Sequence, residues 1–340
     1  MTIDLAPLLA RGDLDELVLL ADDLATQQRW SELLGLRDGC RRATEDFGKQ
    51  LWGVAQYAEY RVALDGPDDL AAGVVEPGAG RFALGPLTEV IAQNHPFHAI
   101  ADGLHPSVID VVAQERVIRG EDLTADDRHD PLRSGLPAVC QPWEPAYPRP
   151  TYRRTDRLDG DPPAPPAARP AFVRATPATG RGERTDVERA LGALVEAWVR
   201  ESGGVVTVAS TAGGPNEVLG LLDVDEAQLT ELTLSEATVR MAGAGASGGA
   251  RGRRRGGAAG RAGAWWVIAA ACGLDLPCEP DELEYRAEDR RWYEFGRLEA
   301  PQAAWSLYLI ITDPGGGWSA AIEAYDTAPV DDAAGAPSEE

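Results

Sequence analysis

The sequence predicts an α+β protein with an all-α N-terminal domain, a proline-rich strap and a C-terminal α+β domain. Three observations support this prediction. Apolar residues recur at helical spacing along the first third of the chain, prolines crowd its middle, and short runs near the C-terminus alternate apolar with polar residues. The 340 residues, 44% of them hydrophobic, are enough for two packed cores. We place the domains at residues 1–122 and 185–327, the strap and linker at 123–184, and a disordered acidic tail at 328–340.

The N-terminal domain is expected to consist of short amphipathic helices. The first follows Asp13, whose carboxylate can accept hydrogen bonds from the free N–H groups of a first helical turn. Further helices are expected to begin near Trp30, Leu51 and Pro86, and another at Pro106, because proline suits the first helical position. No strand pattern separates these helices, which predicts a helical bundle or a short α-solenoid of the HEAT or armadillo type. Solenoids of this type bind partners along a concave face.

The prolines of the strap and linker exclude regular structure over most of this span, because proline lacks an N–H donor and fixes φ. The segment PWEPAYPRPTY, residues 142–152, also carries Trp143, Tyr147 and Tyr152, which a solvated linker does not need. We therefore expect this segment to be ordered and packed on a domain. The next proline cluster, DGDPPAPPAARP at 159–170, has no aromatic residue and is expected to be an extended, flexible spacer.

The C-terminal domain is expected to begin with a helix near Asp186 that buries Leu191 and Trp198 on one face. The β-branched run at residues 205–210 predicts a buried strand. Residues 225–241 are predicted to form a further helix.

Three strands are expected to close this domain, opened by Trp292, Trp305 and Trp318. Residues 314–317, PGGG, have the composition of a hairpin loop between the last two strands. Apolar and polar residues alternate after Trp305, so that one face of the strand is strongly apolar. We therefore expect an antiparallel three-stranded meander with helices covering one face.

The most unusual stretch is GGARGRRRGGAAGRAGAWWVIAAACG at residues 248–273, in a chain whose net charge is −23. A glycine-rich basic loop precedes an apolar helix. Guanidinium groups are forked donors for phosphate or carboxylate, and a helix N-terminus near Ala258 would favour an anion at the same place. The stretch thus indicates a candidate anion site; the alternative is a mobile, solvated loop whose arginines are attracted to the protein's own acidic surface. The candidate ligand-binding residues are Arg251, Arg253, Arg254, Arg255 and Arg261.

The apolar helix that follows this loop contains adjacent tryptophans, Trp265 and Trp266. Neighbouring residues lie about 100° apart around a helix, so one indole is expected in the core and the other beside a groove. Glycines at 260 and 263 weaken a helix, and we expect them to allow its close approach to the sheet.

No metal, cofactor or catalytic residue is assigned from the sequence. The basic loop lacks the lysine and the Ser/Thr of the phosphate-binding pattern G-x-x-x-x-G-K-[ST]. His95, His98 and His105 lie close together, but their spacing fits no named metal motif. The 4 cysteines form no C-x-x-C pair, which leaves a zinc ribbon or a redox site unsupported.

Two short motifs carry a family resemblance. Residues 260–266 follow the pattern GR-x-(G/S)-A-W-W, and residues 291–295 are RWYEF. On these motifs the chain resembles uncharacterised actinobacterial proteins of unknown function, which have the first pattern in their C-terminal half. The resemblance implies no activity and no cofactor.

Together these features predict a non-enzymatic binding or scaffold protein with a protein partner on the helical domain. The alternative is binding of a phosphorylated small molecule or nucleic acid through the loop at 248–261; an enzyme of unrecognised class is the third hypothesis. The net charge of −23 disfavours nucleic acid, because the average surface repels a polyanion. No apolar run approaches the roughly 20 residues that cross a bilayer, and the N-terminus lacks a signal-peptide pattern. We therefore expect a cytoplasmic protein without a membrane contact.

Overall fold

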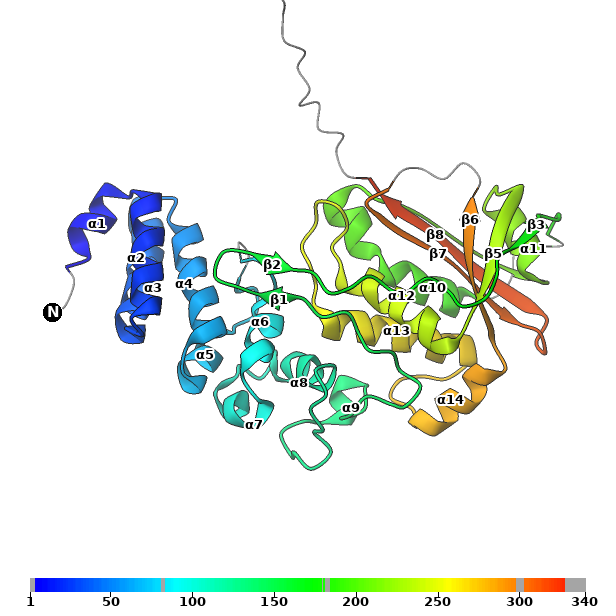
Figure 1. Ribbon diagram of the computed structural model, residues 1–340, viewed down its shortest axis with the longest axis horizontal. Helices are drawn as coiled ribbons and strands as arrows, with labels where there is room; N and C mark the ends of the chain where they lie inside the picture. The colour runs from blue at the N-terminus through cyan, green and yellow to red at the C-terminus, as the bar shows by residue number, and fades with distance from the viewer. Residues whose placement is uncertain (1–3, 81–82, 179, 181–183, 298–302, 328–340) are drawn as a thin grey trace, which may run out of the picture.

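The computed structural model describes residues 4–80, 83–178, 180, 184–297 and 303–327 (Figure 1). The expected acidic tail at 328–340 lies outside the described residues.

Helices α1 to α8, which we call the helical array, follow one another from the N-terminus towards the C-terminal domain. Their bounds, with those of α9 in the loop that follows, are α1 (Ala6–Arg11), α2 (Leu14–Thr26), α3 (Trp30–Phe47), α4 (Trp52–Asp65), α5 (Asp68–Val74), α6 (Leu87–Asn94), α7 (Phe97–Ile100), α8 (Ile109–Val117) and α9 (Pro131–Ser134), with a 3-10 turn at Ala101–Gly103.

Helices of the array pack mainly on their neighbours in the chain. Helices α2 and α3 contact α4, α4 contacts α5 and α6, and α6 contacts α8. Their apolar faces meet in one core, where Leu33, Val62 and Ile91 are fully buried. The helical periodicity seen in the sequence is therefore the pattern of contacts along this row of helices.

Four of the five predicted helix starts are confirmed, those of α2, α3, α4 and α6. Asp13 caps α2, since its carboxylate accepts hydrogen bonds from the N–H groups of Asp15 and Glu16. The helix expected to begin at Pro106 begins instead at Ile109, because a turn occupies the residues between them.

The strap lies across the junction between the array and the C-terminal domain (Figure 1). It contains a two-stranded hairpin, β1 (Thr151–Tyr152) and β2 (Arg157–Leu158), and β1 contacts α6. The side chain of Tyr152 is buried in the core of the array. Trp143 packs on Trp265 of the C-terminal domain, with ring centroids 5.1 Å apart. The aromatic residues of the strap thus contact both parts of the molecule.

Among the described residues, the C-terminal domain has a six-stranded antiparallel sheet in the order β3-β5-β6-β7-β8-β4. The strands that carry Trp292, Trp305 and Trp318 are adjacent in it, but the sheet continues on both sides of them. The three strands expected to close the domain thus lie side by side and antiparallel, but they are part of a larger sheet that also contains β5, β3 and β4. The strands are β3 (Ala171–Arg174), β4 (Val205–Ala212), β5 (Glu226–Leu232), β6 (Arg291–Arg297), β7 (Trp305–Asp313) and β8 (Trp318–Asp326).

Strand β5 occupies residues that were expected to be helical. Over residues 226–230 buried positions alternate with more exposed ones, with Ala227 and Leu229 buried in the core, which is the period of a strand. The helix α12 (Leu234–Ala246) begins only after Thr233, which forms a reciprocal capping box with Glu236. The capping residues, rather than the apolar spacing, mark the true helix start.

Helices cover both faces of the sheet, not one. Helices α10 (Thr185–Leu194), α12, α13 (Gly257–Cys272) and α14 (Pro280–Glu288) pack on one face. Helix α11 (Pro215–Leu221) covers part of the other face, against Phe295 and Ile310. Strand β4, expected to be buried, is an edge strand whose one partner in the described sheet is β8, and its Val205 is 47% exposed.

Helices α12 and α13 cross at closely packed glycines. A Cβ atom at Gly260 would lie 2.1 Å from the carbonyl oxygen of Ala242, and one at Gly263 would lie 2.7 Å from Leu194 on α10. The glycines of α13 therefore allow contact with neighbouring helices, not with the sheet as expected. In the described part of the chain, no helix is long and apolar enough to cross a bilayer.

Candidate functional site

The arginine loop, residues 248–256, joins α12 to α13 and lies between the array and the C-terminal domain. Its backbone is held at three points. The N–H group of Ala250 donates to Asp326 over 2.6 Å, that of Arg251 donates to the hydroxyl of Ser202 over 2.6 Å, and that of Arg255 donates to the Ala246 carbonyl over 2.8 Å. The loop is thus tied to the C-terminal domain and not free in solvent.

Arg254 points inward and forms a bidentate ion pair with Glu89 of α6. Its Nε and Nη2 atoms lie 2.7 and 2.8 Å from the two carboxylate oxygens. The hydroxyl of Tyr152 also donates to Glu89, over 2.6 Å. Burial opposes ionisation of Glu89, but these donors and the charge of Arg254 outweigh it and hold the pKa of the carboxyl below its usual value. One arginine of the candidate set therefore links the loop to the array.

The N-terminus of α13 receives two carboxylates from the array. The N–H group of Gly257 donates to Glu89 over 3.2 Å, and that of Ala258 donates to Glu115 of α8 over 2.8 Å. Arg119 is paired with Glu115 at 2.8 Å. The anion that favours a helix N-terminus is thus supplied by the protein itself at this end of α13.

Of the two carboxylates at this helix end, Glu115 is the one whose ionisation is disfavoured. Burial, and then the nearby charge of Glu89, raises the pKa of the Glu115 carboxyl to about 7, although Arg119 and the N–H group of Ala258 oppose the shift. Glu89 and Glu115 therefore titrate differently although both meet the same helix end.

Arg261 is fully buried on the first turns of α13 and binds the strap. Its Nε and Nη2 atoms lie 2.8 and 2.7 Å from the carboxylate of Glu144. It also donates to the side chain of Gln114 on α8 and to the carbonyls of Pro137 and Val139. The arginine of the GR-x-(G/S)-A-W-W pattern therefore connects three segments: α13, α8 and the strap.

Of the two tryptophans of that pattern, one lies in the core, as predicted, and the other is partly exposed. Trp265 is fully buried, while Trp266 is 39% exposed. The guanidinium of Arg261 lies 5.6 Å from the ring centroid of Trp265, close enough for a cation–π contact. Arg261 and Trp265 of the pattern thus pack at the junction.

The structure divides the five candidate arginines into two groups. Arg254 and Arg261 are paired with carboxylates inside the protein. Arg251, Arg253 and Arg255 are exposed, and no carboxylate pairs with their side chains among the described residues. The five arginines therefore do not form a single anion site, whereas the three exposed arginines remain available to a ligand.

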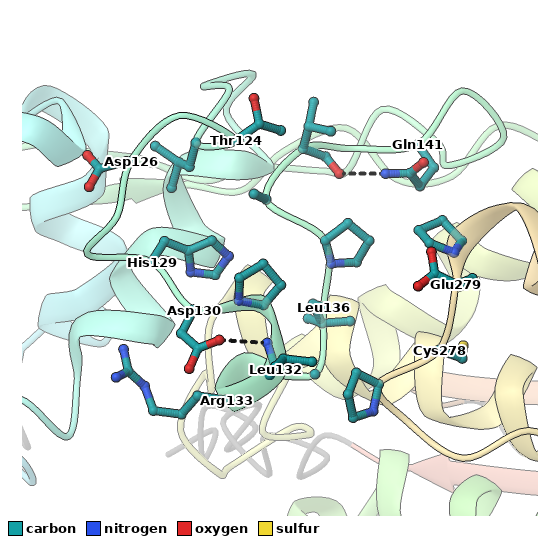
Figure 2. A pocket seen from close by; sticks show the side chains of 18 of the residues that line it. Thr124, Asp126, His129, Asp130, Leu132, Arg133, Leu136, Gln141, Cys278 and Glu279 are labelled. Atoms are coloured by element: carbon teal, nitrogen blue, oxygen red, sulfur yellow. Dashed lines mark hydrogen bonds between the residues drawn. The ribbon is translucent and has the colours of Figure 1, made fainter.

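A wide cavity of about 1060 Å³ lies between the loop at 123–141 and the start of α14 (Figure 2). His129 forms part of its wall. The Nε2 atom of His129 lies 3.3 Å from the amide nitrogen of Gln114, and its Nδ1 atom lies 4.0 Å from Asp110. Burial lowers the pKa of His129, which keeps the imidazole neutral near pH 7. Through Gln114, this histidine extends the buried polar network of Arg261.

In the described part of the chain, the other histidines and the cysteine thiols form no recognisable catalytic or metal centre. His95 is bound to Asp68 at 2.6 Å and His105 to Ser107 at 2.8 Å. No described group of three His, Cys, Asp or Glu side chains is placed to hold a metal ion. Burial raises the pKa of Cys40 and Cys272 to about 11, so both thiols are protonated at neutral pH.

The sequence also contains the pattern G-x-S-x-G at residues 245–249, which is typical of a nucleophilic serine between a strand and a helix. Here Ser247 follows the last turn of α12 instead. It is buried, and its oxygen accepts a hydrogen bond from the indole of Trp198 over 2.8 Å. Ser247 therefore has a packing role.

Residues 15–328 match the model of DUF6183, a family of unknown function. The chain belongs to this family. The match begins at the start of α2 and covers the rest of the array, the strap and the sheet, but not α1, so the family is defined by both parts of the molecule together. No curated protein and no solved structure matches the chain. Membership in DUF6183 implies no activity, and the function must be argued from the geometry.

The carboxylates that meet the arginines were missed at the level of sequence. Glu89, Glu115 and Glu144 are three of 55 acidic residues, and each lies more than a hundred positions from its partner in α13 or the loop. The sequence did offer one sign that two of them are buried and paired, because Glu89 and Glu115 lie within apolar helical runs. A carboxylate at such a position is rarely buried unless it is paired.

Proposed function

We propose that the protein is a non-enzymatic binding protein and that its helical array docks a helical segment of a partner protein. The observation that supports this most is an apolar groove between α1 and the C-terminal half of α3, with a volume of about 450 Å³. At its edge Phe47 is 76% exposed, which is unusual for a large aromatic side chain. The groove is lined by Ala6, Leu9, Ala10, Gly39, Arg42, Ala43, Asp46, Phe47 and Lys49.

The walls of this groove are held in place by specific contacts. The side chain of Leu9 fills the space above Gly39, where an added Cβ would lie only 2.6 Å from it. The ammonium group of Lys49 donates to the carbonyl of Leu9 over 2.9 Å and to that of Ala10. These contacts fix α1 on α3, so the groove is present before a partner binds, which lowers the entropic cost of binding.

The chemistry of the groove favours an amphipathic helix with acidic flanking residues. Small apolar side chains form its floor, and apolar anchors spaced by three or four residues on a helix match such a floor. Arg42 stands exposed at the edge, with no carboxylate paired to it among the described residues. On a chain of net charge −23, this local positive charge is suited to an acidic residue of the partner.

Site-specific photo-crosslinking tests the proposal. A photoreactive phenylalanine analogue at Phe47 should yield one discrete protein adduct in cells that naturally make the protein. The same analogue at Tyr285, which is 72% exposed on α14, is the matched control and should not yield that adduct. The adduct should disappear with Arg42→Glu and persist with Arg189→Glu, an equal charge change at an exposed position on α10. Identical adducts at both positions, or an adduct indifferent to Arg42→Glu, would overturn the assignment.

A further inference from the structure

We propose that a second site, independent of the groove, binds the phosphate group of a small molecule in a cleft beside the arginine loop. The cleft has a volume of about 350 Å³, which is within the range of small-ligand pockets. Three separate segments form it, namely residues 78–80 and 83–86 between α5 and α6, the strand β2 and the arginine loop. Its lining residues are Gly78, Ala79, Gly80, Ala83, Leu84, Gly85, Pro86, Arg157, Gly252, Arg253 and Arg254.

The three guanidiniums of the cleft differ in how their charge is balanced. Arg254 is neutralised by Glu89, as described above. Arg157 is paired with Asp159 at 2.8 Å. Arg253 has no paired carboxylate among the described residues, and its side chain is exposed. The cleft therefore carries one uncompensated positive charge within its lining, which is the chemistry that attracts an anion.

Neighbouring residues strengthen this local potential. Arg251 and Arg255 are also exposed and lie two positions to either side of Arg253. The exposed surface of the loop therefore carries three arginines, although the side chain of Glu201 lies close to Gly252 on the same stretch. Guanidinium groups match the oxygen geometry of phosphate better than ammonium groups do, because their N–H donors are planar and forked.

The backbone of the cleft is both fixed and accessible. A Cβ at Gly252 would lie 2.1 Å from the carbonyl oxygen of Gly248, so only glycine fits this tight turn and the position of Arg253 is set by it. On the opposite wall Gly78 and Gly80 have φ values of +77° and +74°, a conformation that side chains disfavour. Glycines on both walls let phosphate oxygens approach the main chain closely.

The same features favour a small molecule over a nucleic acid. An extended polyanion would have to lie over the acidic surface beyond the cleft, where it is repelled. A small phosphate ester needs only the cleft, in which Arg253 is the exposed arginine. One wall of the cleft belongs to the array and another to the arginine loop. A bound phosphate would therefore link the array to the C-terminal domain, as the ion pair of Arg254 with Glu89 does.

Calorimetric titration of the full chain with inorganic pyrophosphate tests this inference. We expect saturable binding at one site, and about tenfold weaker binding by Arg253→Ala, since loss of one charge-assisted contact costs at least this factor. Arg189→Ala removes an exposed arginine of α10 and should bind pyrophosphate as the wild type does. Because Arg253 has no partner in the described structure, its replacement should leave the melting temperature without ligand unchanged.

Three results would overturn the inference. They are no binding of pyrophosphate, equal weakening by Arg253→Ala and Arg189→Ala, and tighter binding of a short single-stranded RNA through Arg253. The crosslinking result at Phe47 does not affect these outcomes, so the phosphate site and the partner groove are tested independently.

Discussion

Replacing Arg261 by methionine removes a buried charge while keeping much of the side-chain volume. Arg261 and Glu144 are both 0% exposed, so Glu144 would be left as an uncompensated buried carboxylate. It would keep only the hydrogen bonds from the N–H group of Gln141 and the hydroxyl of Tyr147. Breaking a buried ion pair by removing one partner costs about 3–5 kcal/mol. We therefore expect the free energy of unfolding of Arg261→Met to be lower than that of the wild type by about this amount at pH 8.

The pH dependence gives this prediction a second measurable consequence. In the wild type, burial raises the pKa of Glu144, but hydrogen bonds and charge from Arg261 outweigh burial and hold the pKa below its usual value. Without Arg261, burial dominates, and the pKa in the folded state rises above that in the unfolded state. A carboxyl with a raised folded-state pKa gains stability as the pH falls through that pKa. The deficit of the variant should therefore narrow between pH 8 and pH 5.

Urea unfolding followed by tryptophan fluorescence at the two pH values measures both effects. Arg200→Met is the matched control, because Arg200 pairs with Glu196 on the surface, where the two side chains are 74% and 55% exposed. That variant should be nearly as stable as the wild type. A loss of stability in Arg261→Met no larger than that of the control, or a deficit identical at pH 5 and pH 8, would refute the reasoning.

Further predictions concern the buried carboxylate at the junction and the crossing of α12 and α13. Since Glu115 has a folded-state pKa of about 7 against 4.5 for the free side chain, its ionisation costs stability as the pH rises through this window, up to about 3 kcal/mol. Glu115→Gln should therefore raise the free energy of unfolding at pH 8 and change it much less at pH 5, in denaturant titrations. Gly260→Ala should destabilise the protein by about 1–3 kcal/mol, because the new Cβ meets the carbonyl of Ala242. Gly243→Ala on α12, where a Cβ meets nothing within 4 Å, should instead stabilise it by roughly 0.5–1 kcal/mol, and thermal melts compare the two.

The parts of the fold that could be predicted from sequence depend on local signals. The helix starts of the array and the capping of α2 by Asp13 follow from residues close together in the chain. The division of Trp265 and Trp266 between core and surface follows from helical geometry alone. Strand β5 was predicted as a helix because its few apolar residues fit both periods over so short a run.

The candidate site was harder to predict because its decisive contacts are between residues far apart in sequence. The basic stretch correctly drew attention to α13 and its loop, but not to what its arginines bind. Nothing local indicates that Glu89 meets Arg254 or that Glu144 meets Arg261, since acidic residues occur throughout the chain. The glycines of α13 were also assigned the wrong neighbour, because sequence does not show which element a helix crosses.

The central claim is that α13 and the arginine loop join the helical array to the α+β domain as one cooperative unit. Differential scanning calorimetry of the full chain tests it most directly. We predict a single unfolding transition whose calorimetric and van't Hoff enthalpies agree in the wild type, and a van't Hoff enthalpy below the calorimetric one in Arg254→Met, which loses one of the contacts across the junction. Two independent transitions in the wild type, unchanged by Arg254→Met, would contradict the claim.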